Sequence, residues 1–276
     1  MELDDIDTVG VVGAGTMGSG IAQVAAVAGY RVVVRDVEEG LVADAVETIQ
    51  GSLARSVERG DLDRSAADAA RDRIEGTTDL ATLEGADLVV EAVTEDLDIK
   101  KSVFGDLADT CGDDTVLATN TSTLSITAIA GAVDRPERVV GLHFMNPVPV
   151  MAGVEVVVAE HTNAATVDLA HAFAADLGKE TWEADDKPGF VVNRVLMPWI
   201  NEGIRAYDEG VAEKGDVDRG LRLGTNVPMG PLELADHIGL DVVLDASETL
   251  HEELGDRYRP AYLLKRKVEA GHLGKK

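Results

Sequence analysis

The sequence predicts an α/β protein in which a mostly parallel sheet with helices on both faces precedes a smaller all-α domain. In the first half of the 276 residues, short β-branched runs alternate with helical stretches, which is typical of a parallel sheet. After the breaker pair Pro188-Gly189, strand-like runs disappear and helical periodicity takes over. We therefore place a domain boundary near Asp186, between residues 1–186 and residues 187–276.

Each candidate strand of the sheet is a short run rich in β-branched residues. In chain order the candidates are Thr8–Val12, Arg31–Arg35, Asp87–Val93, Thr115–Ala118, Arg138–His143 and Val154–Ala159. The helices expected between them include Thr16–Ala28, Ile99–Thr110 and Ala164–Leu177. A helical region over about residues 38–73 is longer than an ordinary crossover. We expect it to form a projecting pair of helices with Gly60-Asp61 as the turn.

Helical periodicity covers most of the second domain. The predicted helices are Val191–Glu209, Asp216–Leu223, Pro231–Leu250 and Tyr262–Ala270. The segment MGPLELADHIGLDVVLDA holds more apolar residues than a small domain can bury by itself. We therefore expect an exposed apolar patch there, of the kind that marks an interface.

Composition excludes several classes of protein. Apolar residues make up 45% of the chain, which suffices for a packed core, and no run approaches the roughly 18 apolar residues of a membrane span. The start, MELDDIDTVG, lacks the basic and apolar regions of a signal peptide. Cys111 is the only cysteine, which excludes an internal disulfide and a multi-cysteine metal site. We expect a cytoplasmic protein with no bound metal and no membrane partner.

The charge balance is strongly acidic, with 51 acidic residues, 25 basic residues and a net charge of -26. This balance disfavours nucleic acid as a partner, because nucleic acid requires a basic face. The acids are spread among periodic apolar residues and do not form a disordered tail. We interpret the charge as halophilic adaptation, since screening by salt relieves such self-repulsion. The alternative is an ordinary acidic cytosolic protein.

A glycine-rich loop follows the first predicted strand. Gly13, Gly15 and Gly18 form a G-x-G-x-x-G pattern, with Thr16 and Met17 inside it, at the start of a predicted helix. Glycines there permit a tight turn and close approach of the backbone to a pyrophosphate, and the helix N-terminus supplies free N–H groups. In this context the pattern predicts a Rossmann-type dinucleotide domain. The alternative is a tight structural turn.

The choice between NAD and NADP depends on the end of the second predicted strand. Asp36 stands there, where an acid binds the ribose 2′-hydroxyl of NAD and disfavours a 2′-phosphate. The neighbouring Arg35 could weaken that preference. The sequence therefore favours NAD.

Two further strand ends carry polar residues. Glu91 is followed by Glu95 and Lys100, and the local evidence favours an ordinary solvated helix start with acid–base pairing. The stretch LATNTSTLSIT carries a polar cluster that could bind a cofactor or substrate, or merely cap the helix beginning near Ser125. That cluster is Asn120, Thr121, Ser122 and Thr123.

The run LHFMNPVPV carries His143, Asn146 and two prolines. Because a proline cannot donate to a sheet ladder, the strand should stop near Asn146 and leave His143 at its end, where open α/β sheets bind ligands. By itself this run favours a satisfied core histidine. Glu155 lies just inside the apolar run VEVVVAE, where a charge is costly unless it is paired or at a sheet edge. Pairing Glu155 with His143 would explain both residues and would leave one ring nitrogen free to take a proton.

Asn193, in GFVVNRVL, stands near the start of the first helix of the second domain. It would reach a cleft if that domain closes over the strand ends. Local evidence favours a surface or helix-start asparagine.

Taken together, five motifs resemble the L-3-hydroxyacyl-CoA dehydrogenase family, and most closely its short bacterial-type members. In order they are GAGTMGSGIA, ATNTSTLSIT, GLHFMNPVPVM, KPGFVVNRVL and LGTNVPMGPLELADHIGLD, and the resemblance runs from about Val9 to the last residue. It implies NAD as the cofactor and the interconversion of (S)-3-hydroxyacyl-CoA and 3-oxoacyl-CoA. It also implies a 3-hydroxybutyryl-CoA-like substrate, a place in fatty-acid metabolism and a homodimer formed through the second domain.

The resemblance implies roles for particular residues. His143 would be the general base and Glu155 its orienting acid, and Ser122 and Asn193 would bind the substrate oxygen or hold this pair. The NAD side would comprise Gly13, Gly15, Thr16, Met17, Gly18, Asp36, Glu95, Lys100, Asn120, Ser122 and Asn146.

The chain departs from the family pattern at three places. After PVPVM the family usually has a lysine, whereas this chain has Ala152-Gly153. In the projecting helices, SVERGDL replaces a lysine-rich stretch that helps hold the CoA phosphates, and only Arg55 and Arg59 remain nearby. The missing lysines leave open a dehydrogenase of a small 3-hydroxy acid without CoA. A separate alternative is a non-catalytic NAD-binding or structural protein. The family also continues past GHLGKK into a Gly- and aromatic-rich tail, so either the natural protein is shorter or this chain is truncated.

Overall fold

The computed structural model describes residues 2–275 and divides into two compact units. The first unit ends at Asp186 and the second begins at Lys187. No helix in the described part of the chain is long and apolar enough to cross a membrane.

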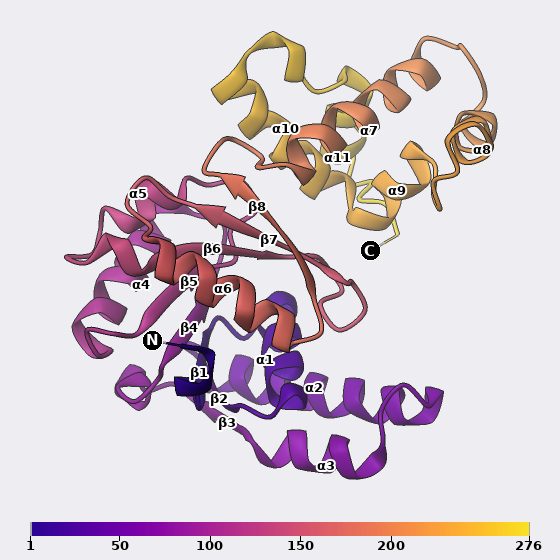
Figure 1. Cartoon of the computed structure of the whole chain (residues 1–276). Coiled ribbons are helices and arrows are strands. Elements are labelled where there is room, and N and C mark those ends of the chain that lie inside the picture. Colours follow the sequence, from indigo (N-terminus) through magenta and orange to yellow (C-terminus); the bar gives the residue numbers. More distant parts are fainter. Residues whose placement is uncertain (1, 276) are drawn as a thin grey trace. The chain divides into compact units, whose positions relative to one another are not determined.

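The described residues of the first unit form an eight-stranded sheet in the order β3-β2-β1-β4-β5-β6-β7-β8 (Figure 1). Its strands are β1 Thr8–Val12, β2 Arg31–Arg35, β3 Ile74–Thr77, β4 Leu88–Glu91, β5 Val116–Thr119, β6 Val139–Phe144, β7 Gly153–Val158 and β8 Glu180–Asp185. All neighbours pair in parallel except β6 and β7, which are antiparallel. The predicted fold class, a mostly parallel sheet with helices, is confirmed.

The helices of this unit alternate with the strands. They are α1 Thr16–Ala28, α2 Glu39–Arg59, α3 Arg64–Asp72, α4 Leu97–Thr110, α5 Ile126–Ala130 and α6 Ala164–Asp176. Figure 1 shows α2 and α3 extending together beyond the β3 edge of the sheet, as the predicted projecting pair. The turn between them follows Gly60, whose left-handed φ of 78° ends α2.

Two edge strands, β3 and β8, were missing from the sequence prediction. β3 reads IEGT and β8 reads ETWEAD, so neither has the β-branched apolar run that marked the inner strands. Edge strands pair on one side only and are less buried, so they need fewer apolar residues. The apolar pattern that marks a strand in the sequence is therefore weak in β3 and β8. Of the six predicted strands, Thr8–Val12 and Arg31–Arg35 match the structure at both ends, and the ends of the other four differ by one or two residues.

The second unit is helical throughout its described residues. Its helices are α7 Val192–Asp208, α8 Lys214–Thr225, α9 Pro231–Ile238, α10 Leu240–Leu254 and α11 Tyr262–Glu269. Short 3₁₀ turns complete the chain at Leu3–Asp5, Leu80–Leu83, Pro136–Arg138 and Asp256–Tyr258.

Two expectations about the second unit were wrong. The single helix predicted over Pro231–Leu250 is two helices, because Gly239 has a φ of 108° that no helix accommodates. The apolar side chains of this segment are largely buried in the unit's own core and do not form the expected exposed patch. The buried ones include Leu232, Ala235, Val243 and Leu244.

Candidate active site

The glycine loop between β1 and α1 has the geometry that a dinucleotide requires. A side chain at Gly13, which has a φ of 105°, would place its Cβ 2.5 Å from the carbonyl oxygen of Ala92. A Cβ at Gly18 would strike the backbone of Gly13 itself, so the helix packs directly on the loop. At Gly15, by contrast, an added Cβ meets nothing within 4 Å. The loop therefore presents bare backbone to open space at the N-terminus of α1, which fits a pyrophosphate.

The two residues inside the pattern have different surroundings. Thr16 is exposed at the first turn of α1, whereas Met17 is half-buried against the core of the unit. Thr16 is therefore accessible to a ligand at the loop, whereas Met17 packs against the core.

Asp36 follows β2 directly and holds the glycine loop. Its Oδ2 accepts a hydrogen bond of 2.6 Å from the backbone N–H of Ala14, and its Oδ1 accepts one from Val37. A carboxylate has about four acceptor positions, so both oxygens keep capacity for a ribose hydroxyl. Arg35 donates to the carbonyl of Thr78. These residues fit NAD.

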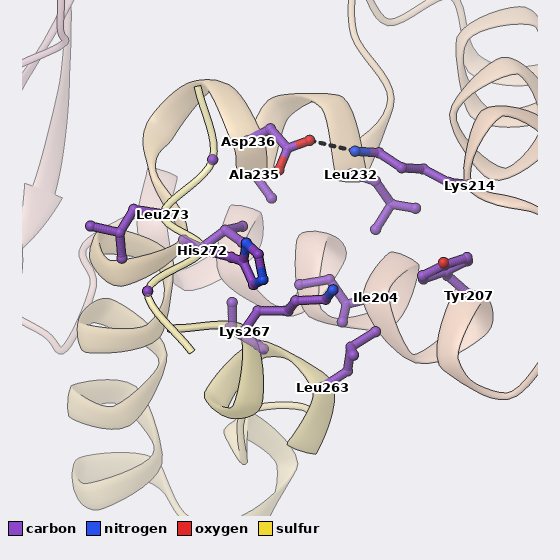
Figure 2. A pocket seen from close by; sticks show the side chains of 14 residues that line it. Ile204, Tyr207, Lys214, Leu232, Ala235, Asp236, Leu263, Lys267, His272 and Leu273 are labelled. Carbon is purple, nitrogen blue, oxygen red and sulfur yellow. Dashed lines mark hydrogen bonds and ion pairs between the residues drawn. The ribbon is translucent and has the colours of Figure 1, made fainter. Parts of the chain in front are cut away.

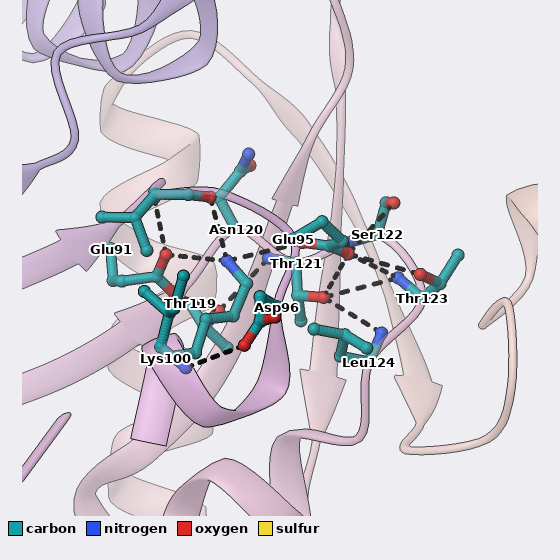
Figure 3. Close-up of polar contacts among 12 residues, drawn as sticks. Glu91, Glu95, Asp96, Lys100, Thr119, Asn120, Thr121, Ser122, Thr123 and Leu124 are labelled. Atoms are coloured by element: carbon teal, nitrogen blue, oxygen red, sulfur yellow. Dashed lines mark hydrogen bonds and ion pairs between the residues drawn. The ribbon is translucent and has the colours of Figure 1, made fainter. Parts of the chain in front are cut away.

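Glu91, the last residue of β4, and Lys100, in the first turn of α4, are both buried. Lys100 Nζ lies 2.7 Å from Glu91 Oε1, and the side chains are 1% and 0% exposed. Thr119 Oγ1 donates to the other Glu91 oxygen. The acid–base pairing suggested by the sequence is present, but a solvated helix start is the wrong description for this pair. Figure 3 shows the network.

Glu95 connects this pair to the turn formed by residues 121–123. Its Oε2 lies 3.4 Å from Lys100 Nζ, and its Oε1 accepts hydrogen bonds from Thr121 Oγ1 at 2.5 Å and from the Ser122 backbone N–H at 2.8 Å. Burial acts to raise the pKa of the Glu95 carboxyl. The Lys100 ammonium and the hydrogen bonds from the turn outweigh burial, so this pKa lies below its usual value. Glu95 is thus a carboxylate that fixes the position of Ser122 (Figure 3).

Asn120 and Ser125 of the polar stretch have different structural partners. Asn120 Oδ1 accepts a hydrogen bond of 2.9 Å from the backbone N–H of Phe144, which ties the ends of β5 and β6 together. Ser125 is the N-cap of α5, because its Oγ accepts from Ala128 N–H. Asp186 adds to this cap, because its carboxylate accepts hydrogen bonds from the backbone N–H groups of Ile126 and Thr127. Residues 120–123 form a separate turn at the carboxyl edge of the sheet.

His143 and Glu155 lie directly opposite each other on the antiparallel strands β6 and β7. His143 Nδ1 is 2.6 Å from Glu155 Oε2, the Glu155 side chain is 0% exposed, and His143 is buried. A neutral histidine holding its proton on Nδ1 would donate it to this carboxylate and keep Nε2 as the basic nitrogen. The pairing that the sequence suggested is thus present in the structure.

Trp182 is a member of this cluster that sequence reasoning missed. Its Nε1–H donates to Glu155 Oε1 at 3.1 Å, across the parallel pair β7 and β8. The alternation of ETWEAD could have indicated a strand with Trp182 on one face. Only the pairing of β8 with β7 brings it to Glu155.

The two asparagines proposed for the site lie in different units. Asn146 is exposed in the loop after β6, which ends at Phe144. Lys179 Nζ donates to the carbonyls of Val148 and Met151 in the same loop. Asn193 is the second residue of α7, in the second unit.

A pocket of about 550 Å³ lies within the helical unit (Figure 2). Leu232, Leu263 and Ile204 form part of its wall, and an ion pair joins Lys214 to Asp236 at its edge. None of the predicted site residues lines it. In the described residues, no group of three or more His, Cys, Asp or Glu side chains is placed to hold a metal ion.

Comparisons with known proteins agree over nearly the whole chain. Residues 8–187 match the family model of the 3-hydroxyacyl-CoA dehydrogenase NAD binding domain, and residues 189–276 match that of the C-terminal domain. The chain is 45% identical to the 3-hydroxybutyryl-CoA dehydrogenase of Bradyrhizobium diazoefficiens, over 98% of this chain and 93% of the relative. It is 46% identical to the probable 3-hydroxybutyryl-CoA dehydrogenase of Bacillus subtilis, over 99% and 95%.

A solved structure of a 3-hydroxybutyryl-CoA dehydrogenase is also similar to this chain over nearly its whole length. The (S)-3-hydroxybutyryl-CoA dehydrogenase of Ralstonia eutropha is 43% identical and superposes with a TM-score of 0.94, covering 98% of this chain and 96% of that one.

Proposed function

The chain belongs to the 3-hydroxyacyl-CoA dehydrogenase family, and we propose that His143 is the general base of this NAD-dependent enzyme and that Glu155 orients it. The family resemblance drawn from the five motifs is confirmed, and with it NAD as the cofactor. The observation that carries the proposal is the distance of 2.6 Å between His143 Nδ1 and Glu155 Oε2.

In the oxidation, His143 Nε2 removes the proton of the substrate's C3 hydroxyl. Glu155 holds the Nδ1–H tautomer and stabilises the imidazolium that forms. When bound, NAD supplies the acceptor for the C3 hydrogen, which leaves as hydride. In the reverse direction the His143 imidazolium returns its proton to the 3-oxo oxygen.

We assign supporting roles to the residues around this pair. Ser122, on the turn held by Glu95, and Asn193 on α7 would bind the substrate oxygen or hold the pair. The NAD side would be formed by the glycine loop, Asp36, Glu95, Asn120 and Asn146. Lys100 is buried against Glu91 and would contribute by holding Glu95.

The proposed substrate is a 3-hydroxybutyryl-CoA-like thioester of fatty-acid metabolism. Near the turn between the projecting helices no lysine is present, and the exposed cations are Arg55, Arg64 and Arg59, of which Arg59 is paired with Asp61. For this reason the test compares NADH formation from (S)-3-hydroxybutyryl-CoA with that from free 3-hydroxybutyrate. Turnover of the thioester supports the proposal. Turnover of the free acid alone would favour a dehydrogenase of small 3-hydroxy acids. If neither compound is turned over, the result would favour a non-catalytic NAD-binding protein.

We further propose a C₂ homodimer formed through the second unit. Large apolar side chains of this unit are exposed, among them Val195, Val211, Leu223 and Tyr262. We also propose a cytoplasmic location, which is supported by the intracellular occurrence of CoA thioesters and NAD. The net charge of -26 supports halophilic adaptation and opposes binding to nucleic acid or anionic membranes.

A further inference from the structure

We propose that Trp182 is a positioning residue for the His143–Glu155 pair, and that Gly153 is what allows its indole to reach Glu155. This inference rests on the proposed roles of His143 and Glu155. It concerns how the buried carboxylate is held, for which two independent features of the structure give evidence.

The first feature is a row of three side chains across adjacent strands. His143 on β6 lies opposite Glu155 on β7, and Glu155 lies opposite Trp182 on β8. Each oxygen of the carboxylate therefore has a donor of its own, with Oε2 facing His143 Nδ1 at 2.6 Å and Oε1 accepting from the indole N–H at 3.1 Å. A fully buried carboxylate is costly unless it is hydrogen-bonded, so each donor to Glu155 helps to offset that cost.

The second feature is the space above Gly153. Gly153 stands two residues before Glu155 on β7, and therefore on the same face of the sheet. A Cβ at this position would lie 2.7 Å and 2.8 Å from Cζ3 and Cη2 of Trp182. The six-membered ring of the indole thus occupies the volume that any side chain at position 153 would need. A larger residue there would push the ring and draw its N–H away from Glu155.

The indole N–H has a chemical consequence for the base. This hydrogen bond withdraws negative charge from the Glu155 carboxylate and fixes its orientation. Glu155 therefore stabilises the His143 imidazolium less strongly than a carboxylate without this donor would. The ionisable side chains on this face of β6, β7 and β8 are His143, Glu155 and Glu180, and Glu180 lies at the exposed start of β8. Trp182 does not titrate, so its effect is exerted through Glu155.

The kinetic test replaces Trp182 with phenylalanine, which keeps an aromatic ring and removes the donor. Without the indole donor, the Glu155 carboxylate carries more negative charge and stabilises the His143 imidazolium more strongly. His143 should then lose its proton only at a higher pH. We expect the acid limb of the kcat/KM profile for 3-hydroxybutyryl-CoA oxidation to move up by about half a pH unit. We also expect kcat to fall roughly threefold to tenfold, with little change in the KM for NAD. Glu155→Gln should move the same limb in the opposite direction.

The spacing test uses Gly153→Ala. In the presence of Trp182 this change should reproduce the shift of Trp182→Phe, because the new methyl group displaces the ring. In the Trp182→Phe background it should add little, because phenylalanine lacks the two ring atoms that the methyl group would strike. Equal effects of Gly153→Ala in both backgrounds would contradict the proposal that the absence of a side chain at Gly153 makes room for the Trp182 indole.

A third measurement does not depend on activity. The chain has two tryptophans, Trp182 and Trp199, so a ¹⁵N–¹H spectrum has two indole signals. Trp199→Phe assigns them and serves as the matched control for the loss of an indole. Glu155→Gln should move the Trp182 signal and leave the Trp199 signal in place. An unmoved Trp182 signal, or an unmoved acid limb in a folded Trp182→Phe variant, would overturn the inference. Full turnover in His143→Ala would instead overturn the proposed function and leave the indole contact intact.

Discussion

Lys100 and Glu91 form an ion pair of 2.7 Å that is almost completely removed from solvent. Glu91 is the last residue of β4, and Lys100 lies near the start of α4. Lys100 also donates to the carbonyl of Val93 at 3.3 Å, and Thr119 at the end of β5 donates to Glu91. The pair therefore joins two strand ends and a helix beneath the turn that carries Ser122.

Breaking this pair on one side should cost more stability than removing both charges. Lys100→Met leaves a buried carboxylate without its cation, which we expect to lower the free energy of unfolding by about 3–5 kcal/mol. The double variant Glu91→Gln, Lys100→Met leaves no fully buried unpaired charge, because Glu95, the other partner of Lys100, is partly exposed, and it should lose less. Urea denaturation at one salt concentration measures both. A double variant less stable than Lys100→Met would contradict this account.

Glu95 should contribute stability that disappears in acid. Its pKa in the folded protein lies below the usual 4.5, so the folded state binds the proton less readily than the unfolded chain. The stabilisation is then complete above that usual value and is lost as the pH falls through the folded pKa. We expect the difference in Tm between the wild type and Glu95→Gln to be largest near neutral pH and to shrink in acid. Glu160→Gln, at an exposed acid, is the matched control, and a difference that grows in acid would contradict the assignment.

The proposed base and its acid should act as one unit. His143→Ala should lower kcat roughly 10²–10⁴-fold by removing general acid–base catalysis, while NADH binding survives. Glu155→Gln should also lower kcat and move the acid limb of the pH profile to lower pH, because the histidine loses the charge that stabilises its protonated form. The losses should not add in the double variant. Turnover near the wild-type rate in His143→Ala would refute the mechanism, and additive losses would mean that Glu155 acts elsewhere.

Salt should stabilise this protein. Residues 1–186 hold 36 acidic and 12 basic side chains, so nearly all of the excess negative charge lies in the first unit. The screening length falls from about 10 Å at 0.1 M salt to about 3 Å at 1 M, which weakens repulsion among these groups. We expect a higher Tm and a higher activity in about 1 M KCl than in about 0.1 M KCl. Equal values at both concentrations would contradict halophilic adaptation.

The assembly prediction is a dimer formed through the helical unit. Light scattering at working salt should give about twice the chain mass of 29.1 kDa. Leu223→Asp and Val211→Asp place charges at exposed apolar positions of this unit and should weaken the dimer if the interface includes them, whereas Val37→Asp, in the first unit, should not. A mass of one chain for the wild type would count against the proposal.

The sequence by itself determined the features that depend on neighbouring residues. Strand β1, the glycine loop and α1 follow one another within about twenty residues, and their alternation, glycines and helical period are local properties. The same is true of Asp36 at the end of β2 and of the α2–α3 pair with its turn at Gly60. Even the pairing of His143 with Glu155 could be suggested, because a charge inside an apolar strand requires a partner.

The tertiary structure alone decided which distant side chains share a face or lose their water. Lys100 looked like a residue of a solvated helix start, but in the folded chain it is buried against Glu91 at the end of β4. The alternation of ETWEAD could indicate a strand, but not that Trp182 meets Glu155, because the neighbour of this polar edge strand is known only once the order β6-β7-β8 is formed. Local sequence sets backbone preferences, whereas burial and cross-strand contact depend on pairings between residues far apart in the chain. The indole that we propose to position Glu155 is therefore visible only in the folded sheet.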